Sequence, residues 1–355
     1  MTHHKTALKI LHEGTVIPAT PLALDENRRF DPRRQRALVR YYLDAGVGGL
    51  AVGVHTTQFE IRDPKHGLFE TVLRTEIEEV RKYEERTGKT LVMVAGACGP
   101  TEQAVKEAAL AKALGYDAVL LSPGGLGEKS EDYMIERTKA VAEVMPVIGF
   151  YLQPSVGGRV FSYRYWERLC ALENLVAIKA APFNRYLTLD VVRAAALSSR
   201  SEQIALYTGN DDSIVTDLIT EYRFARDGKV YTKRFEGGLL GHWSVWTKTA
   251  VEIFNRCKSL HAAHAVPTDI LTLANEVTDA NAAFFDTANS FKGCIAGLHE
   301  VLRRQGLLEG ILCLDPDETL SPGQMEKIDR VYRLYPHLSD DAFVRENLDR
   351  WLSQD

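Results

Sequence analysis

The chain repeats one local pattern, in which a short apolar run is followed by turn residues and then by a longer segment with apolar residues at helical spacing. The runs are almost wholly apolar rather than alternating, which is typical of parallel strands covered on both faces. About eight such units within some 250 residues predict an α/β fold, the (β/α)8 TIM barrel. The predicted strands are Thr15–Thr20, Gly49–Val54, Thr90–Gly96, Ala118–Ser122, Val147–Tyr151, Leu175–Lys179, Ile204–Thr208 and a less regular eighth within Gly237–Trp243.

Helical periodicity fills the segments between these strands and takes over completely after about residue 255. An open doubly wound sheet would share the local pattern, but no G-x-G-x-x-G follows the first strand. We therefore predict a barrel over residues 1–255 and a C-terminal helical extension over residues 256–355. The predicted helices are Pro32–Ala45, Glu70–Glu85, Thr101–Leu114, Ser130–Val144, Tyr163–Leu172, Leu187–Leu197, Ser213–Phe224, Thr268–Thr287, Phe291–Gln305, Gly323–Leu334 and Asp340–Leu352.

Composition excludes several classes of partner. The 43 basic and 48 acidic residues are mixed along the chain, without the basic stripe that neutralises a phosphate backbone, so nucleic acid is not expected. No run of about 18 apolar residues is present to span a membrane, and the first residues lack the apolar core of a secretory signal. The five cysteines show no C-x-x-C spacing, which argues against a zinc site or a disulfide framework. We predict a reduced, cytoplasmic protein.

Barrels of this type place their catalytic groups where strands end, and four of the predicted strands end in reactive or hydrogen-bonding side chains. The sharpest is Lys179, because the apolar run Leu175–Ile178 would carry its ammonium group into a shielded site. Burial disfavours the charged form of a lysine and makes the free amine available as a nucleophile. Such an amine can form a Schiff base with a ketone or aldehyde. The alternative is a lysine that ends a strand and extends to solvent.

Tyr151 precedes Lys179 by 28 residues, the span of one βα unit. The two are therefore expected at the ends of adjacent strands about 5 Å apart, where they could meet over one substrate. A phenol beside a cationic lysine can move protons while an imine forms and breaks. A tyrosine at a strand end can equally fill the core.

Hydroxyl and carboxyl groups follow two other strands. Thr56 and Thr57 come after a glycine-rich strand, and their hydroxyls with nearby backbone amides can form a neutral cradle for a carboxylate. The same hydroxyls could instead satisfy the backbone of the loop. Asn210, Asp211 and Asp212 lack a partner His or Glu elsewhere in the sequence, so we interpret them as a helix cap and turn rather than a metal site.

In this order, the strand ends resemble the dihydrodipicolinate synthase/N-acetylneuraminate lyase family of class I, pyruvate-handling aldolases. The resemblance covers about residues 10–300 and is carried by GTVIPATPL, VGVHTTQFE, VMVAGACGPTEQAVKEAALAKALGYDAVLLSP, GFYLQP, VAIKAA and GNDD. It implies a (β/α)8 barrel with C-terminal helices, a homo-oligomer (tetramer or dimer) and no metal or organic cofactor. It also implies that Lys179 is the Schiff-base lysine, that Tyr151 shuttles protons, and that Thr56 and Thr57 hold the substrate carboxylate and join a proton relay.

Three further residues at these strand ends are predicted to line the substrate site: His55, Gly209 and Asn210. The chain also departs from the family pattern. His55 stands where the family usually has a glycine, Gln58-Phe59-Glu60 replaces a Gly-Glu, and the loop Ser122–Leu126 lacks the relay tyrosine of the synthases.

The arginine with which lysine-pathway synthases bind a second carboxylate is replaced within Ser155–Gly158, although Arg159 lies close enough in sequence to substitute. Without an arginine fork, bidentate recognition of a carboxylate is lost, so the lysine-biosynthetic reaction is disfavoured. Near the eighth strand, the aromatic segment Gly241–Trp246 can pack in the core or wall a bulkier, sugar-like substrate.

The leading hypothesis is a Schiff-base lyase or aldolase that acts on pyruvate or another 2-oxo acid through Lys179. A dehydratase of a 2-keto-3-deoxy sugar acid would use the same imine and expel water. Metal-dependent aldol cleavage would need clustered His and acidic ligands. A non-catalytic 2-oxo-acid-binding protein that kept the barrel is an alternative of another class.

Overall fold

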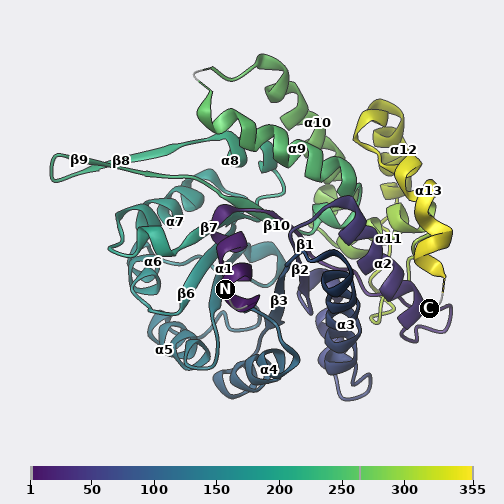
Figure 1. Ribbon diagram of the computed structural model, residues 1–355, viewed down its shortest axis with the longest axis horizontal. Helices are drawn as coiled ribbons and strands as arrows, with labels where there is room; N and C mark the ends of the chain where they lie inside the picture. The colour runs from purple at the N-terminus through teal and green to yellow at the C-terminus, as the bar shows by residue number, and fades with distance from the viewer. Residues whose placement is uncertain (1–2, 264, 354–355) are drawn as a thin grey trace.

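The computed structural model describes residues 3–263 and 265–353 and contains a closed barrel of eight parallel strands (Figure 1). The strands follow the order β1-β10-β7-β6-β5-β4-β3-β2, and a parallel bridge between Ala19 and Ala51 joins the two ends of this order. The predicted (β/α)8 barrel is confirmed, and the open sheet is excluded. The strands are β1 Val16–Pro18, β2 Gly49–Val52, β3 Val92–Ala97, β4 Ala118–Leu121, β5 Val147–Leu152, β6 Leu175–Ala181, β7 Ala205–Thr208 and β10 Gly237–Leu240.

Helices surround the barrel, and the last of them form the predicted C-terminal extension, which lies to one side of the ring in Figure 1. Helix α13 packs against α2, and α10 packs against α8, so the extension covers part of the barrel. The helices are α1 His3–Glu13, α2 Pro32–Ala45, α3 Phe69–Thr87, α4 Thr101–Leu114, α5 Glu131–Ala142, α6 Tyr163–Cys170, α7 Arg185–Leu197, α8 Ile214–Ile219, α9 Thr247–Ser259, α10 Thr268–Phe284, α11 Cys294–Arg304, α12 Gln324–Leu334 and α13 Asp341–Leu352.

The predicted boundary between residues 255 and 256 falls within α9, which continues through it without a break. The division of the chain into two units at that position therefore stays a prediction. The described structure does show that the barrel strands end at Leu240 and that helices and short turns make up the rest, as expected from the loss of strand periodicity.

Two apolar layers hold the barrel together. One layer fills its interior with residues such as Ile17, Val94 and Ile148, and the other lies between the strands and the surrounding helices. Helix α1, which the sequence analysis did not predict, inserts Ala7 and Leu11 into the interior layer. It therefore closes the end of the barrel at which the strands begin, as its central place in Figure 1 shows, and leaves access from the opposite end.

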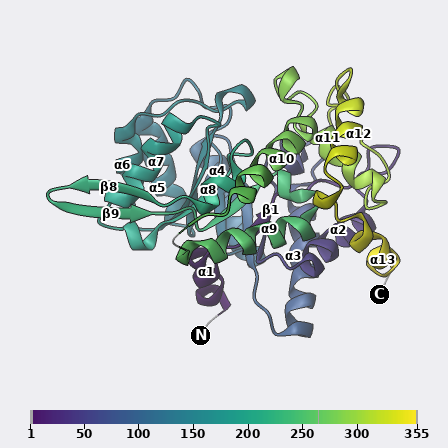
Figure 2. The same ribbon diagram turned by 90° about the horizontal axis from the view of Figure 1, so that it is seen from above.

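The predicted helix Ser213–Phe224 is wrong in its second half. Helix α8 ends at Ile219, and the chain then forms an antiparallel hairpin of β8 Tyr222–Arg226 and β9 Lys229–Lys233, which projects from the barrel in Figures 1 and 2. The two turn residues, Asp227 and Gly228, have φ of 51° and 74°. An Asp-Gly pair is a strong hairpin signal because both positions of this turn need positive φ, so the dipeptide could have corrected the prediction.

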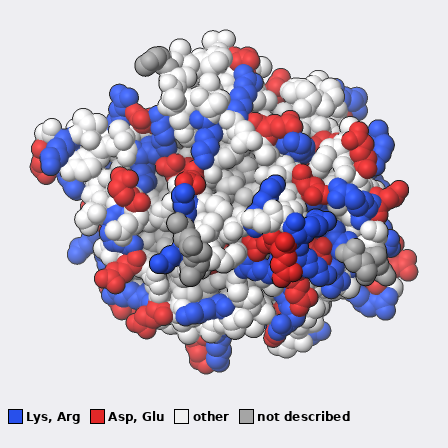
Figure 3. Space-filling model, in the orientation of Figure 1, with Lys and Arg blue, Asp and Glu red and all other residues white. Residues whose placement is uncertain are grey.

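Acidic and basic side chains are interspersed over the face that Figure 3 shows, as the mixed charge of the sequence predicts. Within residues 3–263 and 265–353, no helix is long and apolar enough to cross a membrane. The same residues contain no group of three or more His, Cys, Asp or Glu side chains arranged to hold a metal ion.

Candidate active site

A pocket opens at the carboxyl ends of the barrel strands, where this fold places catalytic groups. It encloses about 590 Å³ of space, the open solvent at its mouth included. Its wall is mostly apolar and aromatic. The polar side chains that line it are few: His55, Thr56, Gln153, Lys179 and Asp211.

Lys179 enters this pocket from β6, directly after the four buried apolar residues Leu175–Ile178 that begin the strand. Its Nζ lies 4.6 Å from the centre of the Phe150 ring on the neighbouring strand. Gly209, after β7, lies so close that a Cβ there would come within 2.5 Å of the Lys179 Cε. Burial lowers the pKa of Lys179 to about 8, while the charge of Asp211 acts in the opposite direction. The amine is therefore shielded, as the sequence predicted.

Asp211 shares the pocket with Lys179, and its carboxylate accepts a hydrogen bond from the backbone N–H of His242 at 3.2 Å. Burial raises the pKa of Asp211 to about 7, against the lowering effect of Lys179. Asp211 and Asp212 do form a turn, as interpreted, but Asp211 is not a helix cap: the N-cap residue of α8 is Ser213, which makes no side-chain capping bond. Its position immediately past a barrel strand was the signal that could have identified it.

Tyr151 does not meet Lys179, contrary to the prediction from their spacing. The β5–β6 register shifts by one residue between Val147 and Ile148, so that Phe150 pairs with Lys179 and Tyr151 pairs with Ala180. Side chains alternate between the two faces of a strand, and one extra residue exchanges the faces. Tyr151 therefore points away from the pocket, into a cluster where its ring centre lies 4.9 Å from that of Trp166.

The two threonines separate in the same way. Thr56 lines the pocket, whereas the Thr57 hydroxyl donates to Thr20 O at 2.7 Å and accepts from Gly53 N–H at 3.0 Å. Thr57 thus satisfies the loop backbone, which was the alternative given to the carboxylate cradle. His55 does line the pocket, and burial followed by the nearby Lys179 lowers its pKa to about 4, so the ring is neutral at pH 7.

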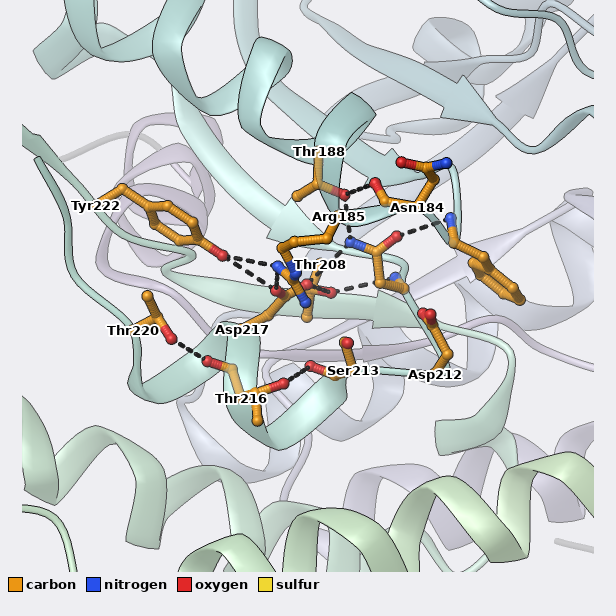
Figure 4. A network of polar contacts seen from close by, with 12 residues as sticks. Asn184, Arg185, Thr188, Thr208, Asp212, Ser213, Thr216, Asp217, Thr220 and Tyr222 are labelled. Atoms are coloured by element: carbon orange, nitrogen blue, oxygen red, sulfur yellow. Dashed lines mark hydrogen bonds and ion pairs between the residues drawn. The ribbon is translucent and has the colours of Figure 1, made fainter. Parts of the chain in front are cut away.

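Asn210 lies outside the pocket and supports its wall. Its amide oxygen accepts from the backbone N–H of Phe183 at 3.1 Å, and its Nδ2 donates to Thr188 at 3.1 Å and Asp217 at 3.0 Å. Figure 4 shows this network around the buried Asp217, which also accepts from Thr208, Arg185 and Tyr222. The network fixes the ends of β6 and β7 relative to each other.

Three phenylalanines that the sequence analysis did not single out form much of the remaining wall: Phe183, Phe285 and Phe291. Two of them come from the loop between α10 and α11, far from the barrel strands in sequence, so no strand-end rule could have found them. Gly241 lines the pocket, but Trp243 and Trp246 of the same segment are buried in the core.

Arg159 does not take over the missing carboxylate site. Its guanidinium donates to Lys129 O and lies 5.1 Å from the centre of the Phe161 ring, outside the residues that line the pocket. Among the described residues of this wall, Lys179 is the only lysine or arginine.

Residues 13–220 match the Dihydrodipicolinate synthetase family. The chain belongs to this family. It is similar to N-acetylneuraminate lyase 2 of Escherichia coli O6:H1, with 22% identity over 332 residues that cover 92% of this chain and 94% of the relative. It is also similar to a probable 5-dehydro-4-deoxyglucarate dehydratase of Pseudarthrobacter chlorophenolicus, with 31% identity over 37% of this chain and 40% of the relative.

Among solved structures, the dihydrodipicolinate synthase from Bacillus clausii superposes with a TM-score of 0.72 over 93% of this chain and 99% of that one, at 16% identity. This likeness confirms the barrel fold. The family predicted from the strand ends is confirmed by the match, and the lyase and dehydratase among the relatives support the prediction of a lyase-type enzyme.

Proposed function

We propose that the protein is a lyase in which Lys179 forms a Schiff base with the carbonyl carbon of a 2-oxo acid. The observation that carries this proposal is a lysine amine inside the pocket of a family member, with a pKa lowered by burial to about 8. A lysine with the ordinary pKa near 10.5 is far less often neutral at pH 7, and the neutral amine is the nucleophile.

The amine of Lys179 attacks C2 of the acid, and the carbinolamine loses water to give a protonated imine. The imine then draws electrons from C3, so that a bond at that carbon can break or form. Protons must move at each stage, and Asp211 is the carboxyl group beside the amine with a pKa near neutrality. We assign this role to Asp211 instead of Tyr151, whose ring lies on the far side of β5.

The substrate carboxylate would lie near Thr56 and the neutral ring of His55, which line the same pocket. Both can donate hydrogen bonds without adding charge. Thr57 would act only by holding the loop that carries them, through its bonds to Thr20 and Gly53.

A dehydratase of a 2-keto-3-deoxy sugar acid is the second candidate, because one relative is named as a probable dehydratase of such an acid. It would begin with the same imine and lose water from the sugar chain. Analysis of the products formed from a 2-keto-3-deoxy sugar acid separates dehydration from cleavage. We also propose, on the likeness to the family, that the protein is cytoplasmic and forms a tetramer or a dimer. Light scattering of the purified chain would test the oligomeric state.

Reduction with borohydride in the presence of pyruvate tests the imine. The mass of pyruvate, less water and plus two hydrogens, should appear on the peptide that contains Lys179 and should be absent in Lys179→Arg. Lys233 is the matched control, because burial also lowers its pKa while its amine donates to Ser201 O outside the pocket. An adduct on Lys233 as readily as on Lys179, or no adduct at all, would refute the proposal. A non-catalytic 2-oxo-acid-binding protein would instead bind pyruvate unchanged in Lys179→Ala.

A further inference from the structure

The outer wall of the pocket is built from phenylalanines that belong to separate parts of the chain. Phe183 follows the end of β6, and Phe291 comes from the loop that connects α10 to α11 in the C-terminal extension. Their rings meet edge to face with centres 5.7 Å apart, the arrangement that aromatic pairs favour. Phe285, Leu152 and Val156 continue the same apolar surface.

Both rings are carried by strained backbone. Phe183 has φ of 48° and Phe291 has φ of 66°, a region that bulky residues rarely occupy. Hydrogen bonds hold both residues in this conformation. Asn210 Oδ1 accepts a hydrogen bond from the backbone N–H of Phe183, and the backbone oxygen of Asp286 accepts one from the N–H of Phe291 at 3.1 Å. Strain that persists because the neighbours enforce it is concentrated at ligand and active sites. The enforced strain at Phe183 and Phe291 therefore marks these two rings as candidates for contact with a ligand.

The polar groups of the pocket do not match a charged or polyhydroxylated partner, which also disfavours the sugar-acid dehydratase as the second candidate function. Lys179 is the only lysine or arginine among the described residues that line it, and Asp211 adds a carboxyl group. A second carboxylate on the reaction partner would lie against the phenylalanine rings without a cation, which is costly. A chain of hydroxyls would lose hydrogen bonds to water there, because Gln153, Thr56 and His55 are the remaining polar side chains of the wall.

We propose that the carbonyl compound joined to, or released from, the 2-oxo acid is an aldehyde with a flat apolar substituent that lies against Phe183 and Phe291. This inference rests on the proposed Schiff base at Lys179. In the synthetic direction, C3 of the enamine forms a bond to the aldehyde carbon, and the carbonyl oxygen takes up a proton to become a hydroxyl. Water then hydrolyses the imine, which frees the amine of Lys179 and a 4-hydroxy-2-oxo acid. No oxidant or reductant is consumed.

The experiment supplies pyruvate with benzaldehyde, glyceraldehyde or glyoxylate in turn and measures the condensation product by mass spectrometry. We expect kcat/KM for benzaldehyde to exceed the values for the other two at least tenfold, since an apolar group in a matching pocket is worth about 10- to 200-fold. Phe183→Ala and Phe291→Ala should each lower the benzaldehyde value about tenfold and leave the glyceraldehyde value within about twofold. Phe224→Ala is the matched control, because Phe224 lies on the β8–β9 hairpin away from the pocket.

Three outcomes would overturn the inference. Equal or better use of glyceraldehyde or glyoxylate would show that the wall does not select an apolar group. Unchanged selectivity in both phenylalanine variants would show that these rings do not contact the partner. In either case a pyruvate adduct on Lys179 would leave the proposed function standing, whereas the absence of that adduct would overturn both proposals. Thermal unfolding of each variant establishes that a loss of activity does not come from a loss of fold.

Discussion

Replacing Gly209 with alanine tests whether the close approach of the backbone to Lys179 positions the amine. A Cβ at this position would lie 2.5 Å from Lys179 Cε, 3.1 Å from Lys179 Cγ and 2.8 Å from Ala181 Cβ. Non-bonded carbons prefer about 3.5–4.0 Å, so the lysine side chain must move by about 1 Å. The Lys179 side chain is flexible, but Ala181 Cβ can move only with its backbone, so the cost of overpacking should lie near the upper end of about 1–3 kcal/mol.

A displacement of about 1 Å in a reacting group can cost about 100-fold in rate. We therefore expect Gly209→Ala to slow formation of the borohydride-trapped pyruvate adduct by about this factor. Gly310→Ala is the control, because a Cβ there meets nothing within 4 Å and its backbone is unstrained. The two variants are compared by single-turnover trapping and by thermal unfolding. Trapping by Gly209→Ala at the rate of the parent protein, with the fold intact, would refute the reasoning that contact with Gly209 sets the position of the amine.

Three other predictions follow from the described contacts. Tyr151→Phe should trap pyruvate within about twofold of the parent rate, because its hydroxyl is outside the pocket; a tenfold loss would restore the tyrosine as proton shuttle. The rate of adduct formation should rise as pH increases through about 8, the pKa of Lys179. The pH midpoint of this rise should be lower in Asp211→Asn, because the Asp211 charge raises the pKa of Lys179. Burial raises the pKa of Glu76 to about 8, despite hydrogen bonds from Thr20 and Gln35. This folded-state pKa exceeds the unfolded value of 4.5, so protonated Glu76 contributes fully to the free energy of unfolding below pH 4.5. That contribution is lost as pH rises through 8. Urea unfolding of Glu76→Gln should show a smaller decline over that range, and an identical decline would contradict the assignment.

Sequence patterns predicted the barrel because each strand is a continuous apolar run, and they predicted Lys179 because a charged residue directly inside such a run must face a shielded site. They failed for Tyr151 because a spacing of 28 residues does not reveal the register shift at Val147 and Ile148. The shift depends on how two strands pair, and it decides which of Phe150 and Tyr151 faces the interior.

The rest of the site depends on contacts between distant segments. Nothing near Phe291 in the sequence indicates that it meets Phe183, since the chain passes through helices α7 to α10, the strands β7 and β10 and the hairpin before it returns to the pocket. Gln58 is a similar case: it holds φ of 71°, and its side chain accepts the N–H of Leu314 at 2.6 Å. A glutamine at a position that the family fills with glycine indicated that this loop differs from the family. The sequence could not indicate its partner, because Leu314 lies in the C-terminal extension.

The loop between α10 and α11 brings Phe285 and Phe291 to a pocket in which Lys179, the residue that we propose to react, belongs to the barrel. The portion of the gene that encodes Lys179 and its strand is thus distinct from the portion that encodes these two wall residues. Substitutions in the later portion can change which compounds enter without disturbing the strands that hold Lys179. Proteins with this arrangement can diversify in substrate while retaining one reaction. Exchange of residues 285–293 between relatives is a direct way to transfer a substrate preference from one protein to another.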